Sequence, residues 1–283
     1  MRKNIFRITL YSFVIFLVLI AVHSCRKDRP DTDTQASVDN SICEGEFSRI
    51  FPQTSNIAVG DSGVQRKGGD IPVPFSGCPD HYIDSADIAD GFPVTMWLYF
   101  GTDSDGDGIY ETPCTGPDGR SRAGVIEAVF SDKWHMPGAN ITMTLQNYFV
   151  NSIQYEGTVS VTRNVNGFSH TVTNGKCSHG SAWSISWNCS RTVTLLGELT
   201  QTLSDDVCLV SGSASGTDRK GGAFSVTINT PLRRQMDCPY ITKGVQTIKI
   251  QGKKDRTIDY GDGTCDDKAK LIIDGNEFEF NLQ

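Results

Sequence analysis

The chain has 283 residues, a formal net charge of −7 at pH 7 and nine cysteines. Nucleic acid binding requires a basic surface that neutralises phosphates, so this acidic balance excludes nucleic acid as a partner. The length suffices for one large β domain or two smaller ones.

The N-terminal segment is typical of an export signal. Three basic residues, Arg2, Lys3 and Arg7, precede an apolar run of thirteen residues from Leu10 to Val22. This run falls short of the roughly 20 apolar residues that a bilayer-spanning helix needs. A short apolar run behind basic residues indicates a signal that is removed after export. We therefore expect residues 1–24 to be a signal peptide.

The residues around Cys25 resemble the lipobox of bacterial lipoproteins, in which the new N-terminal cysteine carries lipid. Val22 stands three positions before Cys25 and Ser24 directly before it, whereas His23 departs from the usual Ala, Ser or Thr. An ordinary secretory signal or an uncleaved anchor is the alternative. Acyl chains contribute roughly 0.8 kcal/mol per buried methylene, so lipid on Cys25 would anchor the protein stably. We expect an outer membrane lipoprotein on the periplasmic or cell-surface face.

The cysteine count agrees with this assignment. With Cys25 given to the lipid, eight cysteines remain, and an even number in an exported chain favours disulfides. No pair has the CxxC spacing of a thioredoxin-like redox site or a zinc ribbon. We expect four disulfides among Cys43, Cys78, Cys114, Cys177, Cys189, Cys208, Cys238 and Cys265.

After the lipidated cysteine, the chain divides into a tether and a β-rich body. Residues 25–42 are mostly polar and lack apolar periodicity, which predicts a disordered tether. From residue 43 onward, short runs of alternating apolar and polar residues stand between turn residues, as in strands with one buried face. We expect almost no helix in the body, apart from a short helical turn at 83–90.

The fold class expected from this pattern is all-β, with antiparallel strands in a meander or sandwich. Three pairs, Asn166–Gly167, Asn174–Gly175 and Asp274–Gly275, suit type I′ hairpin turns, whose two central residues need positive φ. The expected strands are 94–100, 124–130, 141–150, 153–163, 182–187, 192–196, 224–228, 246–250, 269–273 and 278–282.

Two stretches of the body repeat the same order of features. Each runs from Cys-Pro through an aromatic-glycine pair and an acidic loop to a second cysteine and a strand with a basic start. Duplication would give two related β modules, 43–165 and 166–283. Chance in a Gly/Asp/Cys-rich chain would also explain the repeated order of features. Duplication predicts equivalent disulfides, Cys78–Cys114 and Cys238–Cys265.

The remaining cysteines allow a weaker inference. Cys177 and Cys189 are close in sequence and would clamp a hairpin. Cys43 and Cys208 then remain by elimination, although sequence alone does not determine the connectivity.

The sharpest candidate for chemistry is an acidic loop, residues 103–111 (DSDGDGIYE). Calcium takes six to eight oxygen ligands, and carboxylates at alternate positions before a glycine turn supply them in EF-hand loops. Cys114 replaces the twelfth-position Glu and no flanking helices are expected, so a true EF-hand is excluded. We expect a Ca²⁺ loop on a β scaffold, or else an exposed acidic turn. The predicted ligands are Asp103, Asp105, Asp107, the carbonyl of Ile109, and Glu111.

Catalytic patterns are missing from the sequence. The GSASG segment at 212–216 has Ala214 where a nucleophile elbow has serine. HExxH, GxGxxG and the phosphate-binding GxxxxGK[ST] pattern do not occur, and no two histidines have metal-ligand spacing. We therefore expect no enzyme activity and no catalytic residues.

Two features suggest contact with sugars. Trp183 and Trp187 are four residues apart and would share one face of a strand, either in the core or as an exposed platform for stacking on glycans. Residues 84–86 (DSA) resemble the O-glycosylation sequon of Bacteroidota envelope proteins.

Several segments resemble uncharacterised lipoproteins of Bacteroidota-type bacteria. They are the lipobox-like start, GSASGT at 212–217, TINTPL at 227–232 and above all IDYGDGTCD at 258–266 before the Asp274–Gly275 turn. This resemblance implies a cell-envelope β protein and brings no known activity or site.

The leading functional hypothesis is a lipid-anchored cell-envelope β protein with a structural or interaction role and no catalysis. A glycan-binding surface lipoprotein is the first alternative, and a fimbrial-type adhesin subunit is the second. Besides the membrane, the expected partners are a glycan or another envelope protein.

Overall fold

The computed structural model describes residues 33–60, 78–83, 91–116, 118–197, 207–235, 238 and 240–282. The signal peptide, Cys25, the tether up to residue 32 and the DSA sequon at 84–86 lie outside these residues. The helical turn expected at 83–90 also lies outside them, except for Ile83, which ends a strand.

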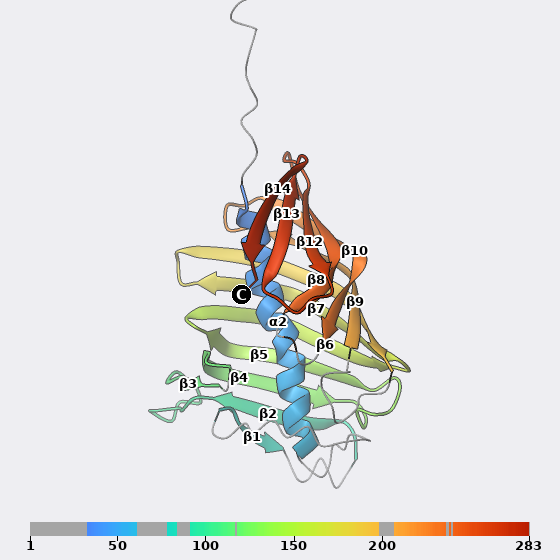
Figure 1. Cartoon of the computed structure of the whole chain (residues 1–283). Coiled ribbons are helices and arrows are strands. Elements are labelled where there is room, and N and C mark those ends of the chain that lie inside the picture. The colour runs from blue at the N-terminus through green and yellow to red at the C-terminus, as the bar shows by residue number, and fades with distance from the viewer. Residues whose placement is uncertain are drawn as a thin grey trace, which may run out of the picture. The chain divides into compact units, whose positions relative to one another are not determined.

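The described strands form one antiparallel sheet of fourteen strands, and nearly every strand pairs with the next along the chain (Figure 1). This confirms the expected all-β antiparallel meander. The strands are β1 (Asp80–Ile83), β2 (Val94–Phe100), β3 (Cys114–Thr115), β4 (Ser121–Phe130), β5 (Asn140–Val150), β6 (Ile153–Asn164), β7 (Gly167–His179), β8 (Trp183–Leu196), β9 (Val207–Thr217), β10 (Ala223–Gln235), β11 (Ile241–Ile250), β12 (Arg256–Asp262), β13 (Lys268–Ile273) and β14 (Asn276–Asn281).

Alternation of side chains gives the sheet one apolar face. In β2, Met96, Leu98 and Phe100 are buried, whereas Trp97 and Tyr99 point to the other face and are half-buried. This two-residue period is the geometric property of a strand on which the sequence pattern depends.

Glycines mark bulges between the long central strands. Gly124 has φ +98°, and a Cβ there would lie 2.0 Å from the carbonyl oxygen of Asn147 on the paired strand. The register shifts at this point, between Ala123 and Val125. Such bulges bend the strand and increase its twist.

The three predicted hairpin turns have different outcomes. Asp274 and Gly275 have φ +51° and +78° and connect β13 to β14, as expected. The β6–β7 turn is one residue earlier than expected, because Gly167 already pairs with Asn164.

The prediction for Asn174–Gly175 is wrong. This pair forms a bulge inside β7, where a Cβ on Gly175 would lie 2.1 Å from the carbonyl oxygen of Trp187.

The expectation of an almost helix-free body is wrong. Helix α2 covers Gln35–Gly60, so residues 35–42 of the expected tether are helical. Its side chains Ala36, Cys43, Phe47 and Ile50 are buried against the sheet. These apolar residues repeat at helical spacing. The polar residues between them also face the sheet, so the apolar periodicity that indicates an amphipathic helix is weak.

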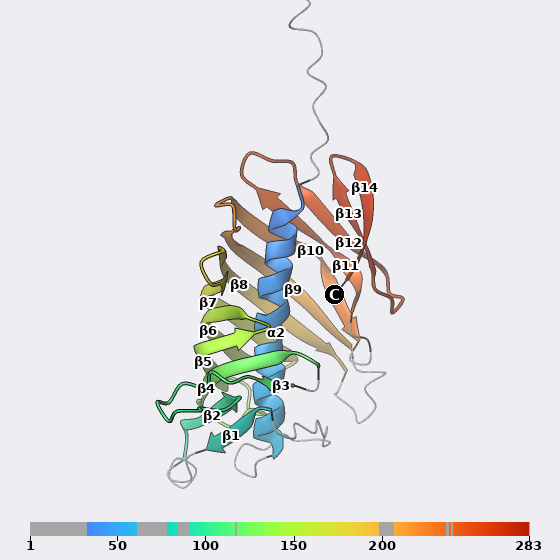
Figure 2. The ribbon, with the colours of Figure 1, turned by 90° about the vertical axis from the view of Figure 1, so that its left-hand side faces the viewer.

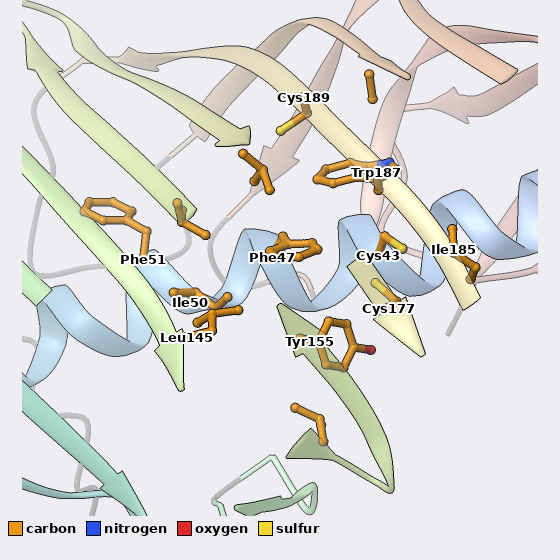
Figure 3. Close-up of a cluster of buried hydrophobic side chains, with 14 of the residues drawn as sticks. Cys43, Phe47, Ile50, Phe51, Leu145, Tyr155, Cys177, Ile185, Trp187 and Cys189 are labelled. Atoms are coloured by element: carbon orange, nitrogen blue, oxygen red, sulfur yellow. The ribbon is translucent and has the colours of Figure 1, made fainter. Parts of the chain in front are cut away.

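Helix α2 lies across the apolar face of the sheet and contacts β6, β7, β8 and β11 (Figures 1 and 2). At the centre of this contact, Phe47 stacks on Trp187 with 5.5 Å between ring centroids and meets Tyr155 edge-on at 5.8 Å (Figure 3). The helix therefore supplies one side of the main core.

Two of the expected disulfides are confirmed, Cys78–Cys114 and Cys238–Cys265. The other two expected pairings, Cys177–Cys189 and Cys43–Cys208, are not formed in this structure, in which all four cysteines are buried thiols.

The strand register explains why Cys177 and Cys189 do not form a hairpin clamp. Cys177 stands opposite Ile185, and Cys189 stands opposite Val172, so the two cysteines lie far apart along the β7–β8 ladder. The boundary expected between two modules, at 165 and 166, falls in the hairpin between β6 and β7 of the same sheet.

Candidate functional site

The acidic loop connects β2 to β3 and is held at both ends. Thr102 and Thr112 pair through backbone hydrogen bonds of 2.9 and 3.3 Å. Gly101 has φ +94°, and a Cβ there would lie 2.0 Å from the carbonyl oxygen of Thr112. The disulfide of Cys114 follows directly. The two ends of the loop are thus held next to each other by backbone hydrogen bonds and by the disulfide that follows.

Three of the five predicted metal ligands come together in this loop. Carboxylate oxygens of Asp103, Asp105 and Asp107 all lie within 4.8 Å of one another. Gly106 and Gly108, which flank Asp107, have positive φ and turn the backbone so that alternate side chains converge.

Backbone donors hold these carboxylates in place. Asp103 accepts hydrogen bonds from the amides of Gly106 at 2.7 Å and Gly108 at 2.8 Å, and Asp107 accepts one from Ile109 at 2.8 Å. The Gly108 bond is the main cause of the lowered pKa of Asp103, because donors favour the charged carboxylate. These backbone donors therefore favour the charged form of Asp103.

Glu111, the fourth predicted carboxylate ligand, lies outside the cluster of Asp103, Asp105 and Asp107. It reaches back across the loop, where its Oε1 accepts a hydrogen bond from the amide of Ser104 at 3.2 Å. Because calcium takes six to eight oxygens, binding would require further ligands from water, backbone carbonyls or a moved Glu111.

A half-open cavity adjoins the loop, and sequence reasoning missed it. Its volume is about 550 Å³, and its wall includes Ile109, Tyr110 and Glu111 from the loop. The opposite wall comes from the ends of β4 and β5 and the turn after β5, with Ala123, Phe149, Asn147 and Asn151 among its residues. We call this the loop pocket.

Aromatic rings extend from the loop pocket over the sheet face opposite the helix. Tyr99 and Tyr110 stack with 4.8 Å between ring centroids. Farther along, Tyr82 and Trp97 lie 5.8 Å apart, and Tyr82 is 52% exposed. No local sequence signal connects these residues, because Tyr82, Trp97 and Tyr110 come from three separate segments.

Of the two alternatives for Trp183 and Trp187, a core face or an exposed glycan platform, the structure has the core face. Trp187 is fully buried, and its indole N–H donates to Asn40 Oδ1 at 2.8 Å. Trp183 is half-buried, beneath the guanidinium of Arg219 at 4.2 Å. The two residues share a strand face as predicted, but helix α2 covers that face.

Buried ionic groups fix the helix to the sheet. Glu46 of α2 has a fully buried side chain and accepts hydrogen bonds from Tyr148 Oη at 2.8 Å and Arg122 Nε at 3.4 Å. Arg122 also donates to both oxygens of Asp118, each at 2.7 Å. Burial lowers the pKa of Arg122, but the hydrogen bonds to Asp118 and the electrostatic effects of Tyr148, Glu46 and Asp118 together outweigh burial and leave the pKa raised.

Two further pairs repeat this arrangement along the helix. Arg191 NH2 donates to Glu44 at 2.8 Å, and Arg219 Nε donates to Asp39 at 2.7 Å. None of these charged residues lines the loop pocket. The acidic and basic residues of these pairs balance each other's charge where the helix meets the sheet.

A cysteine–histidine contact in the core lacks the properties of a catalytic dyad. Cys189 Sγ and His170 Nδ1 are 3.7 Å apart and both residues are buried. Burial raises the pKa of Cys189 to about 12 and lowers that of His170 to about 4. A nucleophilic cysteine needs a lowered pKa and solvent access, so this thiol is unreactive.

Comparisons with protein-family models, with curated proteins and with solved structures found no match. In the part of the chain that the structure describes, no helix has the length and apolar character to cross a membrane.

Proposed function

We propose that this chain is a lipid-anchored, non-catalytic β protein of the cell envelope that binds a partner at the loop pocket. The observation that carries this proposal is that the loop pocket and the carboxylate cluster share one segment, 103–111. The lipid anchor rests on the lipobox-like sequence before Cys25.

The chemistry of the loop supports a role for Ca²⁺ in ordering the pocket. Asp103, Asp105 and Asp107 repel one another, and a bound cation would remove that repulsion. Because Ile109, Tyr110 and Glu111 directly follow, an ion on the carboxylates would also fix the pocket wall. Calcium is thus a structural ligand in this proposal.

A photo-crosslinking residue tests the proposed surface. Ile109 is 43% exposed and lines the loop pocket, whereas Val165 is 77% exposed in the β6–β7 turn. With the crosslinker at position 109 in intact cells, we expect a discrete adduct with an envelope component that position 165 does not form. Equal adducts at both positions, or none at 109, would contradict the proposal.

Glycan binding is a second candidate, favoured by the aromatic rings around the loop pocket. Tyr110 and Phe149 supply apolar ring surface, while Asn147, Asn151 and Glu111 supply polar groups within the same cavity. Pockets that combine apolar walls with a few directed polar groups are typical ligand sites. This candidate no longer depends on Trp183 and Trp187.

A glycan array with and without calcium tests this candidate. The chain from Arg26 onward should bind one glycan class, and Tyr110→Ala and Phe149→Ala should each weaken binding at least about tenfold. Val165→Ala serves as the surface control and should bind as the parent does. Absence of binding to any glycan would leave only the broader interaction role.

The adhesin alternative would need a terminal strand that exchanges between subunits. In the structure β14 pairs with β13 over all six of its residues, and the amide of Leu282 donates to the carbonyl of Asp267. These contacts hold β14 in its own sheet, so no observation favours this alternative.

A further inference from the structure

Two buried thiols meet where helix α2 crosses strand β7. Cys43 on the helix and Cys177 on the strand are both fully buried. Figure 3 shows their side chains pointing toward each other across the contact between the helix and the strand. They come from positions far apart in the chain, so only the docking of the helix brings them together.

The same chain forms two disulfides elsewhere. Cys78–Cys114 and Cys238–Cys265 link segments with Cα atoms 5.7 and 5.9 Å apart. An environment that oxidises those pairs also oxidises other thiols in contact during folding. The sequence before Cys25 independently indicates export to such an environment.

We propose that Cys43 and Cys177 form a third disulfide, which attaches helix α2 covalently to the sheet. In this step the Cys43 Sγ–Cys177 Sγ bond forms, and the two thiols lose two protons and two electrons. The electrons reduce the disulfide of an oxidising thiol–disulfide oxidoreductase to a dithiol, through a mixed disulfide with one of the two cysteines.

The timing of this reaction follows from burial. Burial and the contact with Cys43 raise the pKa of the Cys177 thiol, so the folded protein holds little of the reactive thiolate. Oxidation must therefore occur before α2 docks fully, or when it undocks transiently. Once formed, the disulfide is shielded from reductants by the same burial.

The other two cysteines should remain thiols. Cys189 pairs with Ala214 across the β8–β9 ladder, whereas Cys208 pairs with Leu195, six positions along β8. With the rise per residue of a β-strand, six positions separate the two cysteines by about 20 Å. This distance is too long for a disulfide. The exported chain should hold three disulfides and two buried thiols, apart from Cys25.

Mapping of disulfides by mass spectrometry tests the proposal directly. The full chain is expressed with its signal in a bacterial envelope, quenched with acid, alkylated under denaturing conditions without reductant, and digested. We expect peptides containing Cys43 and Cys177 to be joined, with Cys189 and Cys208 alkylated. Alkylation of Cys43 and Cys177, or a link from either to another cysteine, would overturn the proposal.

Variants provide a second measurement. In the oxidised protein, Cys43→Ala, Cys177→Ala and the double variant should lower the melting temperature equally, by about 10 °C. A reductant strong enough to reach buried disulfides should remove the difference in melting temperature between the parent and these variants. Cys208→Ala, which changes a buried cysteine outside the pair, is the matched control. Additive effects of the two single variants would contradict a shared bond, and peptide mapping of the parent decides the question if a variant fails to fold.

Discussion

Glu46 is the residue on which the docking of the helix depends most. It is a fully buried carboxylate whose charge is balanced by Arg122 and whose oxygen accepts a hydrogen bond from the Tyr148 hydroxyl. Breaking such a buried pair leaves an uncompensated group in the core.

We predict that Glu46→Ala lowers the free energy of unfolding by about 3 kcal/mol or more. Urea unfolding measures this loss. The matched control is Glu156→Ala, which removes an exposed ion pair with Lys176 at 2.6 Å and should cost less than about 1 kcal/mol. Equal losses for the two variants would contradict the role assigned to Glu46.

His170 makes the stability of the fold depend on pH. Burial, with a smaller contribution from Arg191, lowers its pKa from 6.5 to about 4 in the folded state. Below pH 6.5 the unfolded chain therefore binds a proton that the folded chain does not. The stabilisation by neutral His170 is fully present above pH 6.5 and is lost progressively down to pH 4.

We predict that His170→Gln removes a pH-dependent loss of roughly 3 kcal/mol between pH 6.5 and 4. Unfolding free energies measured at half-unit intervals test this. Exposed His179 is the control position, and His179→Gln should leave the slope unchanged. A parent slope that persists in His170→Gln would assign the effect to other groups.

The carboxylate cluster gives a prediction about calcium. Calcium should raise the melting temperature of the chain from Arg26 onward, because it relieves repulsion between Asp103, Asp105 and Asp107. Asp105→Ala with Asp107→Ala should abolish the increase, whereas Asp132→Ala with Asp255→Ala, which are acidic residues outside the cluster, should retain it. An unchanged melting temperature in the parent would exclude the calcium site.

At the scale of elements, helix α2 begins with contacts that extend beyond its own residues. The Asp33 carboxylate accepts a hydrogen bond from the amide of Gln35 at 3.0 Å and forms an ion pair with Lys253. Its carbonyl accepts hydrogen bonds from the fully buried Arg256 at 3.0 and 3.2 Å. The start of the helix is thereby tied to β12 and the turn before it.

We predict that a chain beginning at Ser37 is less stable than one beginning at Arg26, by about 2 kcal/mol or more, because it loses these contacts. Circular dichroism during thermal unfolding measures the difference. Removal of residues 26–32 alone is the control and should cost little. If the chain from Ser37 unfolded like the longer one, Asp33 would have no anchoring role.

At the scale of the whole molecule, one open sheet with a helix across its apolar face carries two distinct surfaces. The helix side is filled by aromatic rings and ion pairs, whereas the opposite side carries the loop pocket and the exposed ring of Tyr82. The proposed binding role therefore involves the face away from the helix.

The proposed lipid anchor gives a prediction for the entire protein. Cys25→Ser should move the chain from the membrane fraction to the soluble periplasmic fraction or block its processing, because no lipid would be attached. Labelling with radioactive palmitate checks this directly. Incorporation of label by Cys25→Ser would contradict lipidation at that residue.

Local patterns in the sequence determined much of the fold. Alternation in β2 and the Asp274–Gly275 turn depend only on the period of a strand and the positive φ of a tight turn, so they can be seen without a structure. The repeated order of features from Cys-Pro to the second cysteine predicted both observed disulfides. The convergence of Asp103, Asp105 and Asp107 was likewise predictable, because it arises within one loop.

Only the tertiary structure decided which polar and aromatic residues face the interior. Asp39, Glu44 and Glu46 were assigned to a tether or left unassigned because they are polar, yet each meets an arginine from a distant part of the sheet, in β4, in β8 or in the turn between β9 and β10. Trp187 could not be placed because the helix that covers it comes from the other end of the chain. Long-range packing determines which partner neutralises or covers a side chain. A local sequence pattern carries no information about that partner.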